Sequence, residues 1–246
     1  MRGIRAFARQ PAFVVITLIQ PMIWLLLFGQ LFKRVVEIPG FSGGSYIDFL
    51  TPGVVVMTVL FSSGWAGMAF IEDMDRGVMD RNLTSPVSRG ALIAGSLAHQ
   101  AVSTVIQTLI IVGVALACGA RFDGGVAGML VLVAAAVLLA LAFAALSDAV
   151  ALLVRQQEAL IGVSQFLVMP LTFLSSVLLA PGLMPGWVAD VARFNPAEWA
   201  ARAARAALAD SPDWGVVGRD LGWLLLLALV AGWLATRAFR AYQRSA

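Results

Sequence analysis

Long apolar stretches alternate with short polar segments along the whole chain. A helix that crosses a membrane needs about 20 consecutive, mainly apolar residues, and the chain holds repeated stretches of this kind. The pattern predicts six transmembrane helices, at 12–32, 47–71, 92–118, 126–147 (or as far as 154), 159–180 and 221–239. Six spans place both ends of the chain on the same side of the membrane. The predicted fold class is therefore an all-α integral membrane protein with one transmembrane domain over 1–246.

Composition supports an integral membrane protein and argues against a soluble domain or a nucleic-acid-binding protein. Hydrophobic residues make up 60% of the chain, whereas soluble domains contain about 45–50%. The net charge is +3, but the arginines are dispersed at segment ends and form no basic stripe, which argues against a nucleic-acid-binding protein. Cys118 is the single cysteine, so no intramolecular disulfide can form, and packing is its expected role.

The basic residues predict the orientation. Ten of the 17 Lys and Arg residues fall on the face that holds both termini, and the other seven fall on the opposite face. Cytoplasmic loops of membrane proteins carry an excess of Lys and Arg. Both termini and the polar segment after the second span are therefore expected in the cytoplasm.

Residues 1–10, "MRGIRAFARQ", have an amphipathic pattern. Ile4, Phe7 and Ala8 share one side of a helix, and the three arginines share the other. The pattern predicts an interfacial helix that lies on the membrane before the first span, while a frayed basic tail is the alternative. The first apolar run is longer than a signal-peptide core and no small-residue cleavage site follows it, so we expect it to stay as a span.

The fifth and sixth spans are joined by a long amphipathic segment, 181–219. Trp187 suits a membrane–water interface. Asn195 can cap a helix whose first position is Pro196, and Glu198 has the spacing of a capping box. We expect a re-entrant region of two short helices that dip into the outer leaflet and return. A helical hairpin that lies on the extracellular surface is the alternative.

The segment 71–90, "IEDMDRGVMDRNLTSPVSRG", is unusually charged for this chain. Ile71, Met74 and Val78 recur at helical spacing and predict a short amphipathic helix at the cytoplasmic surface. A solvated connector is the plainer interpretation of such a helix. The charged residues around its apolar side include Asp75, Arg76, Asp80 and Arg81.

Taken in order, these features resemble a known family. The pieces that carry the resemblance are "MDRGVMDRNLTSPVSRGALIAG", "RQQEALIGVSQFLVMPLTFLSS" and "MPGWVADVARFNPAEWAARAARAAL", together with the six spans. The chain resembles the membrane subunits of type-2 ABC exporters, in particular the daunorubicin-resistance permeases, over its whole length. Many relatives have Ser-Gly where this chain has Ser175 and Ser176, which puts a hinge role at that place in doubt.

The resemblance implies that 71–90 is a coupling segment that docks on a separate ATPase subunit, through Ile71, Met74, Val78 and the charged residues named above. It also implies a second permease half, identical or different, in a bacterial inner membrane. The chain itself has no G-x-x-x-x-G-K-[ST] sequence, and its one lysine, Lys33, lies at the end of the first span, so it lacks a Walker loop. We therefore expect no catalytic residue, cofactor or metal here, with ATP and Mg²⁺ bound by the partner ATPase.

Large apolar side chains in the spans are candidates for a substrate path between two permease halves. Lipid-facing or core packing is the usual role of such residues. The candidates are Trp24, Phe28, Phe61, Trp65, Phe166, Met169 and Phe173.

Three ionisable residues lie within the predicted spans or at their ends. Asp148 and Arg155 share a helix face and could form a latch or a structural pair, and His99 is expected to make an ordinary polar contact rather than carry protons.

The sequence therefore favours the permease subunit of an ATP-driven exporter of a hydrophobic or amphipathic molecule, such as a drug, a lipid or a glycolipid. A gradient-driven secondary transporter is the alternative, although the spans lack carboxylates near their centres. An intramembrane enzyme would need clustered His, Asp or Glu. Sensitivity to ATP depletion or to collapse of the proton gradient would separate the two transport classes.

Overall fold

A computed structural model describes residues 19–31, 45–77, 89–178, 182 and 184–245 of the chain. Over these ranges the ordered elements are helices and the backbone contains no strand, which confirms the all-helical prediction. The helices are η1 (Trp24–Phe28), α3 (Gly29–Leu31), α4 (Tyr46–Gly64), α5 (Met68–Asp75), α7 (Arg89–Ala117), α8 (Gly125–Val154), α9 (Gln157–Phe173), α10 (Gly186–Ala192), α11 (Pro196–Leu208) and α12 (Trp214–Ser245).

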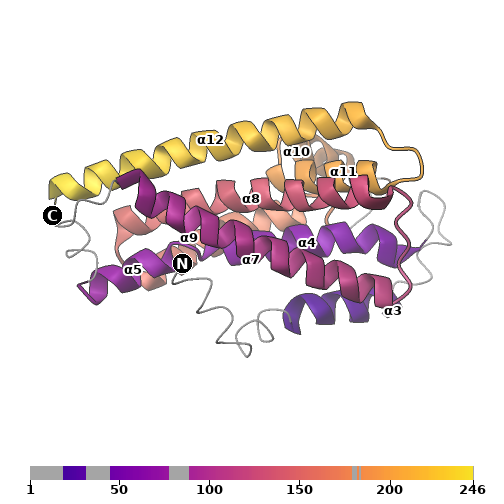
Figure 1. The fold of residues 1–246 in the computed structure, drawn as a ribbon, viewed down its shortest axis with the longest axis horizontal. Helices are drawn as coiled ribbons and strands as arrows, with labels where there is room; N and C mark the ends of the chain where they lie inside the picture. The colour runs from indigo at the N-terminus through magenta and orange to yellow at the C-terminus, as the bar shows by residue number, and fades with distance from the viewer. Residues whose placement is uncertain (1–18, 32–44, 78–88, 179–181, 183, 246) are drawn as a thin grey trace.

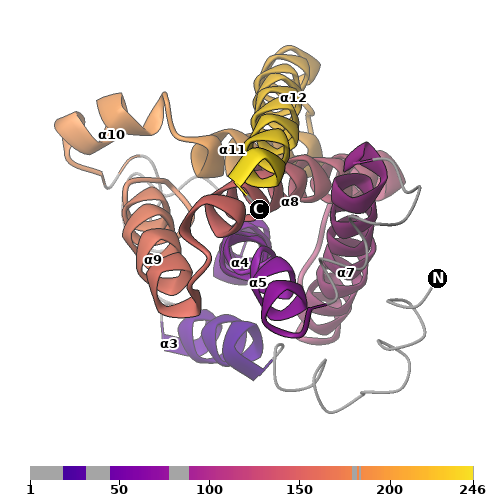
Figure 2. The ribbon, with the colours of Figure 1, turned by 90° about the vertical axis from the view of Figure 1, so that its left-hand side faces the viewer.

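Helix α4 lies at the centre of the bundle. Viewed along its long axis, the bundle places α3, α7, α8, α9 and α12 around α4 and α5 (Figure 2). The α4 sequence is apolar on all sides, and its residues 50–60 are all buried, as expected for a helix enclosed by others. Ser45 begins α4 with a capping box, in which its hydroxyl accepts from the Ile47 N–H and its own N–H donates to Asp48. Helix α8 packs against α4, α7, α11 and α12 and so connects the central helix to the helices around it.

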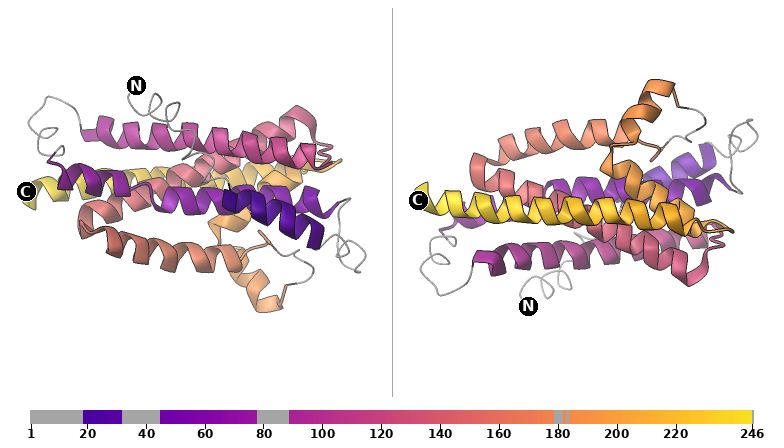
Figure 3. Two further views of the ribbon diagram at one scale, coloured as in Figure 1. Left: turned by 90° about the horizontal axis from the view of Figure 1, so that it is seen from below. Right: turned by 90° about the horizontal axis from the view of Figure 1, so that it is seen from above.

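Two groups of elements lie at opposite ends of the bundle. Helix α5 and the C-terminal end of α12 lie at one end, whereas α10 and α11 lie toward the other (Figure 1). The start of the charged segment and the end of α12 therefore lie at the same end of the bundle. Figure 3 places α9 and α10 on one flank of the bundle and α7 on the opposite flank.

Within the described ranges, four helical stretches are long and apolar enough to cross a membrane: Tyr46–Asp75, Leu92–Ala117, Gly125–Val154 and Trp214–Arg240. They correspond to the second, third, fourth and sixth predicted spans. The structure describes residues 19–31 of the first predicted span, 12–32, and these residues are helical. The interfacial helix predicted at 1–10 lies outside the described residues altogether.

The fifth span differs from the prediction. Helix α9 ends at Phe173 instead of 180 and has 17 residues, or about 26 Å of helix, which is less than the roughly 30 Å of a hydrocarbon core. The backbone after it, 174–178, is not helical. Ser175, Ser176 and Val177 are nevertheless buried, so the chain turns into the bundle at this point.

Gly53 of α4 makes room for this inserted segment. A Cβ atom on Gly53 would overlap the carbonyl oxygen of Val177, which therefore lies directly on the α4 backbone. Only glycine permits such a close approach between a helix and a neighbouring backbone.

Replacing Gly53 by alanine should destabilise the fold. Because the new methyl group must displace the buried Val177 backbone, we expect the free energy of unfolding to fall by about 1–3 kcal/mol. Gly113→Ala in α7 is the matched control, since nothing lies within 4 Å of its Cβ position. This substitution should raise the free energy of unfolding by about 0.5–1 kcal/mol. Thermal unfolding in mild detergent, followed by circular dichroism, measures both. Equal effects of the two substitutions would contradict the close approach at Gly53.

Candidate functional site

The segment 174–178 is the most unusual part of the bundle. Its backbone leaves the α-helical pattern among buried residues, where water is not available to satisfy N–H and C=O groups. Such a backbone is tolerated at membrane depth only where protein groups or a wet cavity provide partners. The partners in this case come mainly from α11.

Three polar side chains of α11 and its cap hold the segment. The Asn195 side-chain amide donates to the carbonyl oxygens of Leu171 and Leu174, at 2.7 and 2.8 Å. The Ser176 N–H donates to Glu198 Oε2 at 2.6 Å. Arg205 Nη1 donates to Ser176 Oγ at 2.7 Å. We call Asn195, Glu198 and Arg205 the α11 clamp.

Arg205 also connects the clamp to α4. Its Nε donates to the Phe49 carbonyl oxygen at 3.2 Å, its Nη2 donates to the Val177 carbonyl oxygen at 3.3 Å, and its guanidinium stacks on the Phe49 ring. Arginine is effectively always protonated in proteins. The side chain therefore stays charged at neutral pH and provides charge-assisted hydrogen bonds.

The structure confirms part of the predicted helix start and corrects the rest. Asn195 caps α11, with its Oδ1 accepting from the Ala197 N–H, and Pro196 occupies the first helical position. The predicted capping box is wrong, because Glu198 bonds to Ser176 and the Asn195 N–H donates to Ala192 instead. Local spacing predicted the box, but the competing partner lies 22 residues away in sequence. Trp187 is exposed near the start of α10.

A second break in helical structure lies at the other end of α4. Residues 65–67 separate α4 from α5, and serines of two neighbouring helices hold this turn. Ser147 accepts from the Gly67 N–H at 3.0 Å and donates to the Gly64 carbonyl oxygen at 2.6 Å. Ser164 donates to the same carbonyl oxygen at 2.7 Å. The turn therefore ties α5 to both α8 and α9.

The predicted coupling residues fall partly on α5. Ile71 is only 1% exposed and packs in a cluster with Phe70, Leu152 and Phe239. It does not form the apolar ridge expected for partner docking, because α5 turns its apolar side toward its own bundle. Met74 is half-buried against the same cluster.

The charged residues that the structure describes in the coupling segment, unlike Ile71, lie at the surface of the bundle. Asp75 and Arg76 are exposed at the end of α5. Arg76 forms an exposed salt bridge with Glu72, at 3.3 Å. Gly77 then takes a positive φ of 67°, which ends the helix in a conformation that glycine adopts freely. The predicted coupling residues Val78, Asp80 and Arg81 lie outside the described residues.

The candidate path residues do not all share one surface. Phe166, Met169 and Phe173 lie at helical spacing on α9 and are strongly exposed, and Trp65 is exposed at the α4–α5 turn. Trp24 and Phe61 instead pack against the main core cluster. The side chain of Phe28 lies outside the described part of the structure. Sequence spacing could not separate these groups, because lipid-facing, core and path residues have the same apolar character in a membrane.

The predicted Asp148–Arg155 pair is not formed. Asp148 is fully buried in α8, and among the described residues neither carboxylate oxygen makes a hydrogen bond of good geometry, although the Ser96 side chain of α7 lies beside it. Arg155 ends α8 in a left-handed conformation and is exposed, and so is His99 on α7. Within the described ranges, no three His, Cys, Asp or Glu side chains are grouped so as to hold a metal ion.

Comparison with known proteins identifies the family. The profile of the ABC-2 type transporter family matches residues 1–209. This chain belongs to the ABC-2 type transporter family. No solved structure matches the chain.

The relatives of this ABC-2 type transporter chain carry the names of permeases. It is 31% identical over 241 residues to the daunorubicin resistance ABC transporter permease protein DrrB1 of Streptomyces coeruleorubidus, covering 96% of this chain and 81% of that protein. It is 27% identical to the putative transport permease ycf38 of Porphyra purpurea, with 95% and 84% covered. It is 22% identical to the probable doxorubicin resistance permease DrrC of Mycobacterium tuberculosis, with 83% and 73% covered. The family expected from the sequence is confirmed.

Removing the Asn195 side chain should weaken the clamp of this ABC-2 transporter chain. Asn195→Ala leaves two buried carbonyl groups and the helix cap without partners, so we expect the free energy of unfolding to fall by about 2–4 kcal/mol. Asn195→Ser keeps a helix cap but cannot reach the Leu171 and Leu174 carbonyl groups. Its free energy of unfolding should therefore be only about 1 kcal/mol higher than that of Asn195→Ala. Thermal unfolding in detergent measures both. A serine variant as stable as the native chain would show that the two donated bonds do not stabilise the fold.

Proposed function

We propose that this chain is the permease subunit of an ATP-driven exporter in a bacterial inner membrane, with both termini in the cytoplasm. In this proposal it moves a hydrophobic or amphipathic molecule, of a drug, lipid or glycolipid kind, out of the cell. The observation that carries the proposal is the similarity to a daunorubicin resistance permease over nearly the whole chain. Resistance to a drug is achieved when the drug is moved outward.

A separate ATPase subunit would provide the energy. The chain has no Walker loop, and the relatives carry the names of permease proteins of ABC transporters. The contact with the ATPase would be made by the exposed charged residues at the end of α5 and those that follow. Charges at the rim of an interface fix orientation and partner choice, and the buried Ile71 would anchor α5 to its own bundle.

The helix break between α4 and α5 suits the transmission of motion. Ser147 and Ser164 connect the turn at Gly64–Gly67 to α8 and α9. Movement of α5 by a docked ATPase would therefore be passed to three helices at once. Packed helices with defined hydrogen bonds move as rigid bodies rather than deform continuously.

The substrate would pass between this chain and a second permease half. Phe166, Met169 and Phe173 expose a large apolar stripe on α9, at one flank of the bundle (Figure 3). Such a surface suits an aromatic or amphipathic molecule, and a second copy of the chain would enclose it. The re-entrant region formed by α10 and α11 would close the outer end of this path.

One observation favours the alternative, a gradient-driven transporter of a lipophilic substrate. Asp148 is a buried carboxylate within a membrane-spanning helix, and ionisable groups at such positions often carry ions or protons. Asp148 lies near one end of α8, however, whereas ion-coupling sites of secondary transporters lie near the membrane midplane. Co-purification of an ATPase with the chain separates the ATP-driven exporter from the gradient-driven transporter.

Charge reversal after α4 should release the ATPase. The full chain is purified from its native membranes in mild detergent, and the proteins that co-purify are identified by mass spectrometry. We expect a Walker-motif ATPase with the native chain. A variant with four charge reversals should retain at least about tenfold less ATPase than the native chain, because like charges would then face each other at the rim of the interface. The four changes are Asp75→Arg, Arg76→Asp, Asp80→Arg and Arg81→Asp.

The control reverses another exposed ion pair. Asp190→Arg with Arg193→Asp changes an ion pair on α10, toward the opposite end of the bundle, and should leave the ATPase bound. Equal retention of the ATPase by both variants would rule out the coupling segment as the docking element. No ATPase with the native chain, under conditions that preserve membrane complexes, would favour the gradient-driven alternative.

A further inference from the structure

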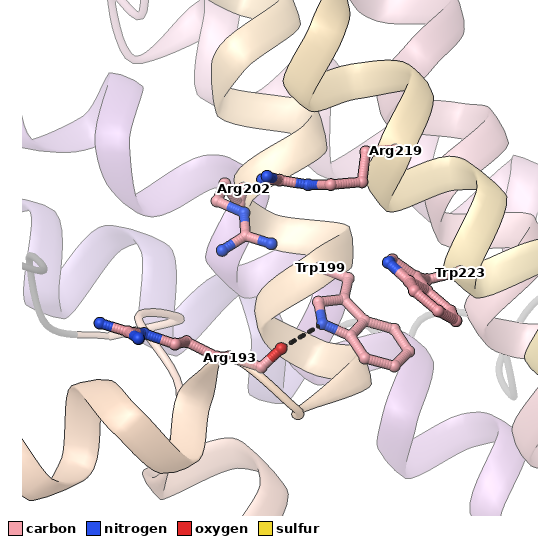
Figure 4. A pocket seen from close by; sticks show the side chains of 5 residues that line it. All are labelled: Arg193, Trp199, Arg202, Arg219 and Trp223. Carbon is pink, nitrogen blue, oxygen red and sulfur yellow. Dashed lines mark hydrogen bonds between the residues drawn. The ribbon is translucent and has the colours of Figure 1, made fainter.

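A cavity between α10, α11 and α12 has an unusual lining. It measures about 340 Å³ and is lined by Arg193, Trp199, Arg202, Arg219 and Trp223 (Figure 4). Three arginines and two tryptophans around one cavity combine positive charge with flat apolar surfaces. None of these residues belongs to the α11 clamp or to the coupling segment.

The counter-charge of two of these arginines, Arg202 and Arg219, is buried, whereas Arg193 pairs with the exposed Asp190. Asp220 is 0% exposed and accepts from both Nε and Nη2 of Arg202, at 2.6 and 2.8 Å. Its Oδ1 also accepts from Arg219 Nε at 3.2 Å. The two guanidinium groups therefore cover the carboxylate, and an anion that enters the cavity meets arginine rather than aspartate.

Both arginines retain hydrogen-bond donors for a ligand. A guanidinium carries five N–H donors, and among the described residues the terminal nitrogens of Arg219 and Nη1 of Arg202 make no hydrogen bond. The Arg219 side chain is 56% exposed. Asp220 holds the two guanidinium groups close together, and guanidinium groups form strong charge-assisted hydrogen bonds to phosphate.

The aromatic side of the cavity continues into an apolar stripe on α12. Trp223, Leu226, Val230 and Trp233 lie on one face of the helix, and each is about half exposed. The eleven residues from Trp223 to Trp233 extend for about 15 Å, which is the thickness of one leaflet of a roughly 30 Å hydrocarbon core. Trp199 packs beside Trp223, with ring centroids 6.1 Å apart, and tryptophans concentrate at the boundary between headgroups and acyl chains.

We propose that this cavity binds the phosphate group of an anionic phospholipid, whose acyl chains lie along the α12 stripe. Arg202 and Arg219 bind the phosphate, Asp220 is a positioning residue, and the two tryptophans lie beside the glycerol region. A free phosphate ion shares the headgroup chemistry, but it would make no use of the stripe. The site shares no residue with the α9 surface proposed for the substrate, and it does not depend on the direction of transport.

Photo-crosslinking of the full chain tests the proposal. The protein is reconstituted in phosphatidylcholine nanodiscs that contain a minor fraction of phosphatidylglycerol with a diazirine in one acyl chain. After illumination, mass spectrometry maps the crosslinks. For the native chain we expect them between Trp223 and Trp233. Arg219→Gln leaves the Arg202–Asp220 pair intact and should lower this yield about tenfold, since charge-assisted bonds to the phosphate are lost.

Three controls separate the possible occupants. Arg237→Gln removes the same charge from the other end of α12, where Arg237 stacks on Trp233, and should leave crosslinking near Trp223 unchanged. Diazirine-labelled phosphatidylcholine should label the stripe weakly, and millimolar inorganic phosphate should not compete. The proposal would be overturned if the labelled phosphatidylglycerol reacted equally with Arg219→Gln and the native chain, or if labelled phosphatidylcholine reacted with the stripe as strongly as labelled phosphatidylglycerol. Full competition by phosphate would show a site for soluble anions, and a native chain without lipid adducts between Trp223 and Trp233 would show that something other than this lipid covers the stripe.

Discussion

The bundle depends on one constraint, which is that every backbone polar group inside a membrane must find a partner within the protein. Residues 174–178 leave the helical pattern inside the bundle, and the α11 clamp supplies their partners. Asn195, Glu198 and Arg205 therefore provide to this segment what water provides to an ordinary loop. The charge on Arg205 is tolerated inside the bundle because its guanidinium donates to two carbonyl groups and Glu198 carries the opposite charge nearby.

The clamp also determines how the rest of the chain packs. Helix α11 is rich in alanine, and most of its residues are buried against α4, α8 and α12. Gly124, which precedes α8, and Gly128 within α8 admit the carbonyl oxygen of Ala207 at the end of α11, where a Cβ atom would collide with it. At the other end of α4, serines hold the turn before α5 in a similar way. An enclosed helix with a fixed break at one end and a fixed insertion near the other fits a proposed permease that couples a cytoplasmic ATPase to an outward path.

The sequence predicted those parts of the fold that depend on local pattern. Four apolar spans, the Asn195 cap and the first-turn Pro196 follow from neighbouring residues, and the structure contains them. The shortened α9, the Glu198–Ser176 bond and the burial of Ile71 depend on residues that are distant in sequence, so periodicity could not show them. The arginine–tryptophan cavity was missed for the same reason, since Arg202 and Asp220 are 18 residues apart. The family was recognisable because its soft motifs occur in a fixed order over the whole chain.

A cysteine at position 175 tests most directly whether the non-helical segment lies inside the bundle. In a Cys118→Ala background, which removes the exposed native thiol, Ser175→Cys changes a buried serine and Ser211→Cys changes an exposed one. A charged maleimide added to the chain in nanodiscs reaches both faces of the membrane. The clamp predicts rapid labelling of Ser211→Cys and labelling of Ser175→Cys only after denaturation. Equal labelling of both variants in the folded protein would contradict a segment that the α11 clamp holds inside the bundle.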